Sequence, residues 1–169
     1  SASNYKATFF DGECAVIATD IPAEEQGTGM LFNMDGEVVG MISSSVWNDT
    51  GKNVVNAYGI SDLKPIIELL INGKSVPYIG IYGTTVTEQL AEEHKMPSGI
   101  YVADVDPDSP AMAAGIQIGD IICEASGEEI KDIAAYQNIV IGSSVGETME
   151  FVGKRLGSDG YVNIKFSVV

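Results

Sequence analysis

Short apolar segments separated by turn residues make up most of this chain, and several alternate between apolar and polar side chains. From Val162 to Val168, every even-numbered position is Val, Ile or Phe, and every odd-numbered position is Asn, Lys or Ser. This period of two is typical of a strand with one buried face. Residues 5–10, 13–19 and 54–60 have a similar β-forming composition. The pattern predicts a mainly β protein with short helices.

Asp-Gly pairs mark predicted hairpin turns, two of them in the first half of the chain. Asp11-Gly12 separates the strands predicted at residues 5–10 and 13–19, and Asp35-Gly36 lies within LFNMDGEVVG. Asp-Gly is favoured in short hairpins because it accepts positive φ angles. The polar stretch SSSVWNDTGKN reads as an exposed loop with Trp47 folded in as an anchor.

Apolar residues at three- and four-residue spacing predict one long helix, with Ser61 as its N-cap and Gly73 at its end. Two shorter helices are predicted further on. One covers residues 85–94, capped by Thr85 or Thr87, and the other follows Asp132 as far as Ile141.

The strand pattern restarts after the linker Lys74-Ser75-Val76-Pro77, with a strand predicted over residues 78–83. We therefore expect two domains, residues 1–75 and 76–169. No segment reaches the ~18 apolar residues of a membrane-spanning helix, and no signal sequence is recognisable at the start.

The formal net charge of −15 and the absence of a basic stripe argue against nucleic acid or an anionic membrane as the partner. Cys14 and Cys123 lie far apart in apolar runs without metal-ligand spacing. We expect buried free thiols, with a disulfide between them as the alternative. Neither a metal nor a cofactor is expected.

The second half resembles a PDZ domain of the bacterial HtrA/Deg type. The resemblance rests on YIGI at residues 78–81, on GIYVADVDPDSPAMAAGIQIGDIICEASGEEI at residues 99–130, and on the helix after Asp132. It implies a β-sandwich or partly open barrel with two helices.

The first half resembles the later part of the trypsin-like protease domain of the same family. The residues that carry this are TDIPAEEQGTGMLFNMDGEVVGMI (19–42) and AYGISDLKPIIELLINGKSV (57–76). The resemblance implies a partial second β-barrel plus a linker helix. The family's first barrel, which supplies the His and Asp of the catalytic triad, is missing from this chain.

Where the family has its nucleophilic Ser, this chain has Gly27 or Thr28, depending on where a one-residue gap is placed, followed by Gly29. Glu24 and Glu25 would add negative charge where an oxyanion must form. The only histidine, His94, lies after a predicted helix in the second half, where a solvated helix end is expected. The loop therefore predicts a degenerate nucleophile site, with catalysis by Thr28 as the alternative.

The resemblance implies that Tyr78, Ile79, Gly80 and Ile81 form the loop that holds a peptide's terminal carboxylate, while the peptide adds a strand by β-augmentation. Three residues of the helix after Asp132 are expected to line the groove: Tyr136, Ile139 and Val140. That helix is apolar nearly all round, so packing on the protease part or on a second subunit is the alternative.

Three functions remain open. The chain is a peptide-binding PDZ module, preferring apolar C-termini, beside an inactive protease remnant; or part of a longer HtrA-family endopeptidase with residual activity; or a structural protein that self-associates through residues 3–45, where a partial barrel exposes strand edges. Resemblance alone implies a location outside the cytoplasm, with an anchor possible only in upstream residues. The resemblance also implies a role in protein quality control.

Overall fold

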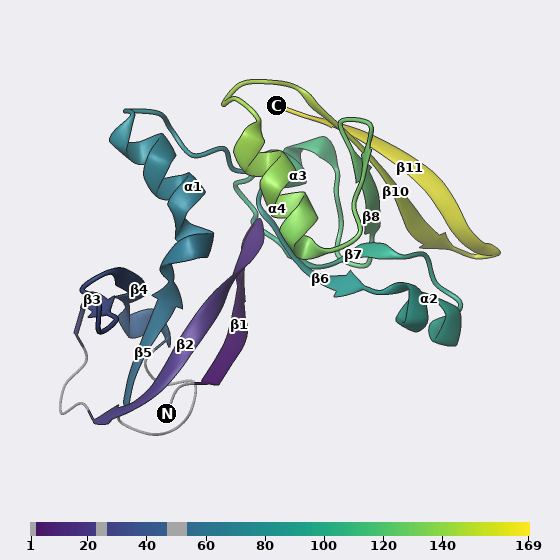
Figure 1. Cartoon of the computed structure of the whole chain (residues 1–169). Coiled ribbons are helices and arrows are strands. Elements are labelled where there is room, and N and C mark those ends of the chain that lie inside the picture. The colour runs from purple at the N-terminus through teal and green to yellow at the C-terminus, as the bar shows by residue number, and fades with distance from the viewer. Residues whose placement is uncertain (1–2, 23–26, 47–53) are drawn as a thin grey trace. The chain divides into compact units, whose positions relative to one another are not determined.

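The computed structural model describes residues 3–22, 27–46 and 54–169, so Trp47, Glu24 and Glu25 lie outside the described residues. The chain forms two compact units. The first comprises Ser1–Ala7 and Cys14–Lys74, and the second comprises Thr8–Glu13 and Ser75–Val169. Each contains an antiparallel sheet, which confirms the prediction of a mainly β protein with short helices (Figure 1).

The sheet of the first unit has the strand order β1-β2-β5-β4-β3. A turn of 3-10 helix, η1 (Ser44–Val46), follows β4. The strands are β1 (Ser3–Phe9), β2 (Gly12–Pro22), β3 (Gly29–Phe32), β4 (Val38–Ile42) and β5 (Val54–Gly59).

The hairpin between β3 and β4 turns at Asp35-Gly36, as predicted. Gly36 supplies the positive φ of 80°, and the Asn33 side chain accepts hydrogen bonds from the backbone N–H groups of Asp35 and Glu37. The Asn33 side-chain oxygen thus serves as the acceptor for backbone N–H groups that the turn would otherwise leave without one.

Helix α1 (Ile60–Ile71) begins directly where β5 ends, with Gly59 as its N-cap and no side-chain cap. The prediction of Ser61 as N-cap was therefore wrong, because the strand enters the helix without a loop. Gly73 follows the C-cap Asn72 with a φ of 69°, as expected for a helix that ends at glycine.

The sheet of the second unit has the order β11-β10-β8-β7-β6, and β9 pairs with β8 (Figure 1). Because β6 ends this order, it is an edge strand. The strands are β6 (Ile81–Val86), β7 (Gly99–Val105), β8 (Ile121–Ala125), β9 (Glu128–Glu129), β10 (Met149–Gly157) and β11 (Gly160–Val168).

Three short helices belong to the second unit: α2 (Glu88–His94), α3 (Pro110–Ala114) and α4 (Ile133–Gly142). The side chains of Thr87, Ser109 and Asp132 cap their first turns by accepting backbone N–H hydrogen bonds. Thr87 and Asp132 were predicted caps. The strand predicted to begin at Tyr78 begins at Ile81 instead, because Gly80 has a φ of 92°, which a strand does not adopt.

The core of the second unit lies between its sheet and α4. Helix α4 contributes Ile133, Tyr136 and Val140, and the Tyr136 ring lies 6.4 Å from the Phe151 ring on β10. Ile79 and Ile81, which flank the glycine of the predicted binding loop, belong to the same core.

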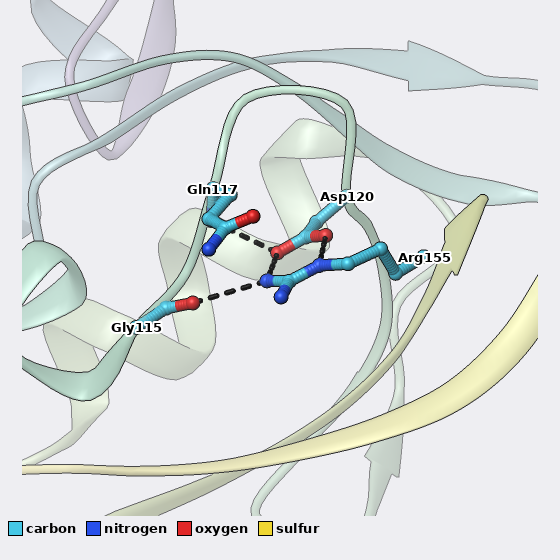
Figure 2. Close-up of polar contacts among 4 residues, drawn as sticks. All are labelled: Gly115, Gln117, Asp120 and Arg155. Carbon is cyan, nitrogen blue, oxygen red and sulfur yellow. Dashed lines mark hydrogen bonds and ion pairs between the residues drawn. The ribbon is translucent and has the colours of Figure 1, made fainter. Parts of the chain in front are cut away.

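A buried carboxylate organises the turn that enters β8 (Figure 2). Asp120 accepts hydrogen bonds from the Arg155 guanidinium at 2.6 and 2.7 Å and from the backbone N–H of Gln117 at 2.9 Å. Arg155 also donates to the Gly115 carbonyl and lies over the Phe166 ring. Asp120 thus joins the turn that enters β8 to β10.

Candidate functional site

The loop of Tyr78 to Ile81 leads into the edge strand β6 and has an unusual backbone path. Gly80 lies in the left-handed region, and a Cβ there would come within 2.1 Å of Ser109 Cβ, so the backbone runs tightly against the start of α3. The Ile79 carbonyl accepts from Ala111, and the Gly80 carbonyl accepts from Asp106. With these carbonyls directed at residues 106–111, the adjoining N–H groups are left to bind elsewhere.

The N–H groups of Ile79, Gly80 and Ile81 all donate to one carboxylate, that of Asp11. Its Oδ2 accepts from Ile79 and Gly80 at 2.7 Å each, and its Oδ1 accepts from Ile81 at 3.0 Å. Successive N–H groups that converge on one anion form a backbone nest, which is a known way to capture a peptide's terminal carboxylate. The loop therefore has the geometry of a carboxylate-binding site.

Tyr136 completes this site from α4. Its hydroxyl donates to Asp11 Oδ1 at 2.6 Å, and its side chain is otherwise buried in the core. Burial, followed by the charge and hydrogen bond of Asp11, raises the pKa of Tyr136 well above its ordinary value. The hydroxyl therefore stays protonated as a donor to the carboxylate.

Asp11 belongs to the second unit as part of the segment Thr8–Glu13. It has a left-handed φ of 62°, is 8% exposed, and donates its own N–H to the Ile81 carbonyl at 2.7 Å. The sequence indicated only a turn here. No pattern in the neighbouring residues could have shown this contact, because its partners lie 68 to 125 positions further along the chain.

The residues predicted to bind a peptide fall into distinct environments. Tyr78 is exposed, Gly80 shapes the loop, and Ile79 and Ile81 offer backbone N–H groups to the site while their side chains are buried. On α4, the hydroxyl of Tyr136 reaches the site, and Val140 is buried in the core. Ile139 is partly buried and borders a hollow of about 510 Å³ with Ser126, Asn138, Ser143 and Glu147 among its lining residues.

Tyr78 fixes the other side of the loop. Its hydroxyl donates to Asp106 Oδ2 at 2.5 Å. Partial loss of solvent around the hydroxyl, with the hydrogen bond and charge of Asp106 adding to it, raises the pKa of Tyr78, and the same hydrogen bond lowers the pKa of Asp106. This contact ties the start of the loop to the turn after β7.

The predicted nucleophile loop is partly described. Gly27, Thr28 and Gly29 are all exposed, and Gly29 begins β3. His94 is the last residue of α2 in the second unit and is exposed. Within residues 3–22, 27–46 and 54–169, no group of three or more His, Cys, Asp or Glu side chains is arranged to hold a metal ion. Across the same ranges, no helix combines the length and apolar character needed to cross a bilayer.

The chain is similar to a known protein family and to solved structures. Residues 101–155 match the family described as PDZ domain. The fold of an HtrA-type protease, AlgW, solved with a decapeptide, matches 91% of this chain and 49% of that chain at a TM-score of 0.53 and 22% identity. Residues 101–155 of the second unit therefore belong to a PDZ domain, as the sequence resemblance implied.

The chain is also similar to part of longer proteases. It is 30% identical over 155 residues, 88% of its length, to the Halomonas elongata protein named "Probable periplasmic serine endoprotease DegP-like", and 30% identical over 164 residues, 89% of its length, to the Serine protease Do-like HtrA of Bacillus subtilis. These alignments cover 32% and 36% of the two relatives, so the chain spans about a third of their length. The chain is homologous to the HtrA/DegP serine proteases.

Proposed function

We propose that the PDZ unit of this chain binds extended peptides by their C-terminal carboxylate and adds them as a strand to β6. The observation that carries the proposal is the convergence of three N–H groups, from Ile79, Gly80 and Ile81, on a single carboxylate. The chemistry of that carboxylate is the same whether it belongs to a side chain or to a chain terminus.

The edge position of β6 supports the second part of the proposal. An edge strand can pair with an extended peptide through main-chain hydrogen bonds, which give affinity without reading the peptide's sequence. Helix α4 runs beside this strand, and the N–H of Ile133 donates to the Thr85 side chain on β6 at 3.1 Å. AlgW, a related structure, was solved with a decapeptide.

We expect apolar C-termini to be preferred, as in the family, and acidic peptides to be disfavoured by the net charge of −15. The test is fluorescence polarisation with labelled pentapeptides that end in valine, leucine or phenylalanine, each made with a free carboxylate and with a terminal amide. Binding of the free-carboxylate set alone supports the proposal. Equal binding of the amidated set contradicts it.

NMR adds a positional readout to this experiment. A bound peptide is expected to shift the amide signals of Ile79, Gly80 and Ile81 and those along β6. Shifts confined to other parts of the chain would contradict binding at this loop even if polarisation detected a complex.

We further propose that this chain does not cut the peptides it binds. Gly27, Thr28 and Gly29 stand where the family's nucleophile loop lies, and the chain has one histidine and no serine in that loop. The alternative is a longer HtrA-family endopeptidase with residual activity from Thr28. Casein cleavage that disappears in Thr28→Ala and persists in Thr84→Ala, a similarly exposed threonine, would favour the alternative.

We propose the location and assembly of this chain from its relatives and its sequence. A relative carries the word periplasmic in its name, and we infer an extracytoplasmic role for this chain, with quality control of other proteins as the process. We expect neither nucleic acid nor a cofactor to take part. We also expect the chain to self-associate through residues 3–45.

A further inference from the structure

The carboxylate site of the PDZ unit is occupied by the chain's own Asp11. We propose that the turn at Phe10 to Glu13 acts as an internal competitor of peptide C-termini, so that Asp11 must leave the loop before a peptide can bind. This inference rests on the proposed function, because it concerns the regulation of the same site.

Asp11 makes both kinds of contact that a peptide terminus would need. Its carboxylate accepts hydrogen bonds from the N–H groups of Ile79, Gly80 and Ile81. It also accepts one from the Tyr136 hydroxyl. Its backbone N–H donates a hydrogen bond to the Ile81 carbonyl, which is the first carbonyl of the edge strand. A peptide that pairs with the start of β6 would use these same groups, so the two cannot bind together.

The neighbours of Asp11 hold the turn on both walls of the site. Phe10 packs edge-on against Tyr82 of β6, with ring centroids 5.8 Å apart. The N–H of Glu13 donates to the Gln137 side chain of α4 at 3.1 Å. Gly12 lies so close to Gln137 that a Cβ would come within 2.5 Å of its Cδ. The turn therefore contacts the strand, the loop and the helix at once.

The backbone conformation of Asp11 also indicates that the turn is held in place by its contacts. A φ of 62° is uncommon for a residue with a side chain, and although Asp tolerates it better than most, it is maintained here by hydrogen bonds at both its backbone and its carboxylate. Release of the turn would relieve this conformation and expose three N–H groups to the incoming carboxylate.

A tethered competitor raises the apparent Kd of a free ligand in a predictable way. Joined through the chain, the carboxylate acts at an effective concentration on the order of millimolar, and the apparent Kd rises by the inverse of the fraction of open sites. Removing the carboxylate should therefore strengthen peptide binding by at least about tenfold.

The test compares Asp11→Gly with Asp35→Gly in the full chain. Both variants remove one aspartate from a hairpin turn and change the net charge equally, and glycine accepts the positive φ at position 11 without strain. The probe is the pentapeptide set above, with free and amidated termini. We expect Asp11→Gly to bind the free-carboxylate peptides at least about tenfold more tightly than wild type, and Asp35→Gly to match wild type.

The outcomes separate this inference from the proposed function. Equal affinity in the three proteins overturns the competition and leaves peptide binding intact. A gain in Asp35→Gly as large as that in Asp11→Gly also overturns it, because the effect would then come from the lost charge and not from the vacated site. No binding to any of the proteins overturns the proposed function and the competition together.

A measurement on wild type covers the case in which Asp11→Gly does not fold. The carboxyl carbon signal of Asp11 is expected to shift as a free-carboxylate peptide saturates the protein, since the side chain leaves its four donors. Saturation with an unchanged Asp11 signal overturns the proposal.

Discussion

Two nitrogens of the Arg155 guanidinium donate hydrogen bonds to the Asp120 carboxylate. The Asp120 side chain is only 1% exposed, whereas that of Arg155 is 33% exposed. A carboxylate buried this deeply depends on its partner, because the partner and the Gln117 N–H replace the water that it has lost.

Removing either member of this pair should destabilise the PDZ unit. For Arg155→Met we expect the free energy of unfolding to fall by roughly 3 kcal/mol, since an unpaired charge would be left buried. Urea unfolding monitored by circular dichroism measures it. Lys165→Met, which removes an exposed positive charge from β11, is the control and should change stability by less than about 0.5 kcal/mol. Similar losses in the two variants would argue against a special role for the pair.

Gly80 should be far less replaceable than a glycine of the same backbone conformation elsewhere in the unit. Gly80 and Gly119 have φ angles of 92° and 93°, but a Cβ at Gly80 meets Ser109 at 2.1 Å, whereas none lies within 4 Å of a Cβ at Gly119. Gly119→Ala should cost about 1–2 kcal/mol for its backbone conformation alone. Gly80→Ala should cost about 1–3 kcal/mol more for the added clash. Equal unfolding midpoints would show that the loop can move away from Ser109.

The thiol of Cys14 should resist alkylation in the folded protein. Burial, reinforced by the Asp62 carboxylate, raises the pKa of Cys14 to about 11, so only about one thiol in a thousand is ionised at pH 8. The pKa of Cys123 is also raised by burial, but this residue is partly exposed. Iodoacetamide at pH 8, followed by mass spectrometry, should modify Cys123 first and Cys14 only in urea.

The same shift at Cys14 sets the sign of a pH effect. Because the pKa is higher in the folded state, the folded chain holds the proton more tightly, and this stabilisation is present below pH 9 and is lost as the pH rises toward 11. Stability measured across this range should fall more in wild type than in Cys14→Ala. A parallel decline in the two proteins would contradict the assignment.

Self-association through the first unit remains a prediction, and β3 is where we expect it. This strand ends the order of its sheet and carries the exposed side chains of Met30 and Phe32. A strand edge with apolar side chains can pair with a second copy, and a lysine there opposes such pairing. Light scattering should find dimers of wild type and monomers of Phe32→Lys. Ile118→Lys, an equally exposed site in the second unit, should stay dimeric, and a monomeric wild type would refute the prediction.

Local signals predicted much of this fold. Thr87 and Asp132 were recognisable caps, and the Asp35-Gly36 turn was recognisable because its chemistry lies within a few residues. Ser61 failed as a cap because β5 and α1 are contiguous, which composition does not reveal. The nearly all-round apolar character of α4 is explained in part by Ile133, Tyr136 and Val140, which all enter the core.

Only part of the carboxylate site could be predicted from the sequence. The loop at residues 78–81 followed from a family resemblance, and its glycine is placed as a close backbone approach requires. Asp11 could not be foreseen, because an Asp before a Gly is ordinary in a turn. Its role depends on long-range contacts with residues 79–81 and 136, which no local spacing encodes.

The convergence of Ile79, Gly80 and Ile81 on Asp11 also bears on how a guest would be selected. When a peptide displaces Asp11, its terminal carboxylate would replace the Asp11 carboxylate on the same donors. The enthalpies of the two sets of hydrogen bonds would therefore largely cancel. Calorimetry should then record little heat from binding of the terminal carboxylate itself. Discrimination among peptides would then depend on the side chains upstream of the terminus.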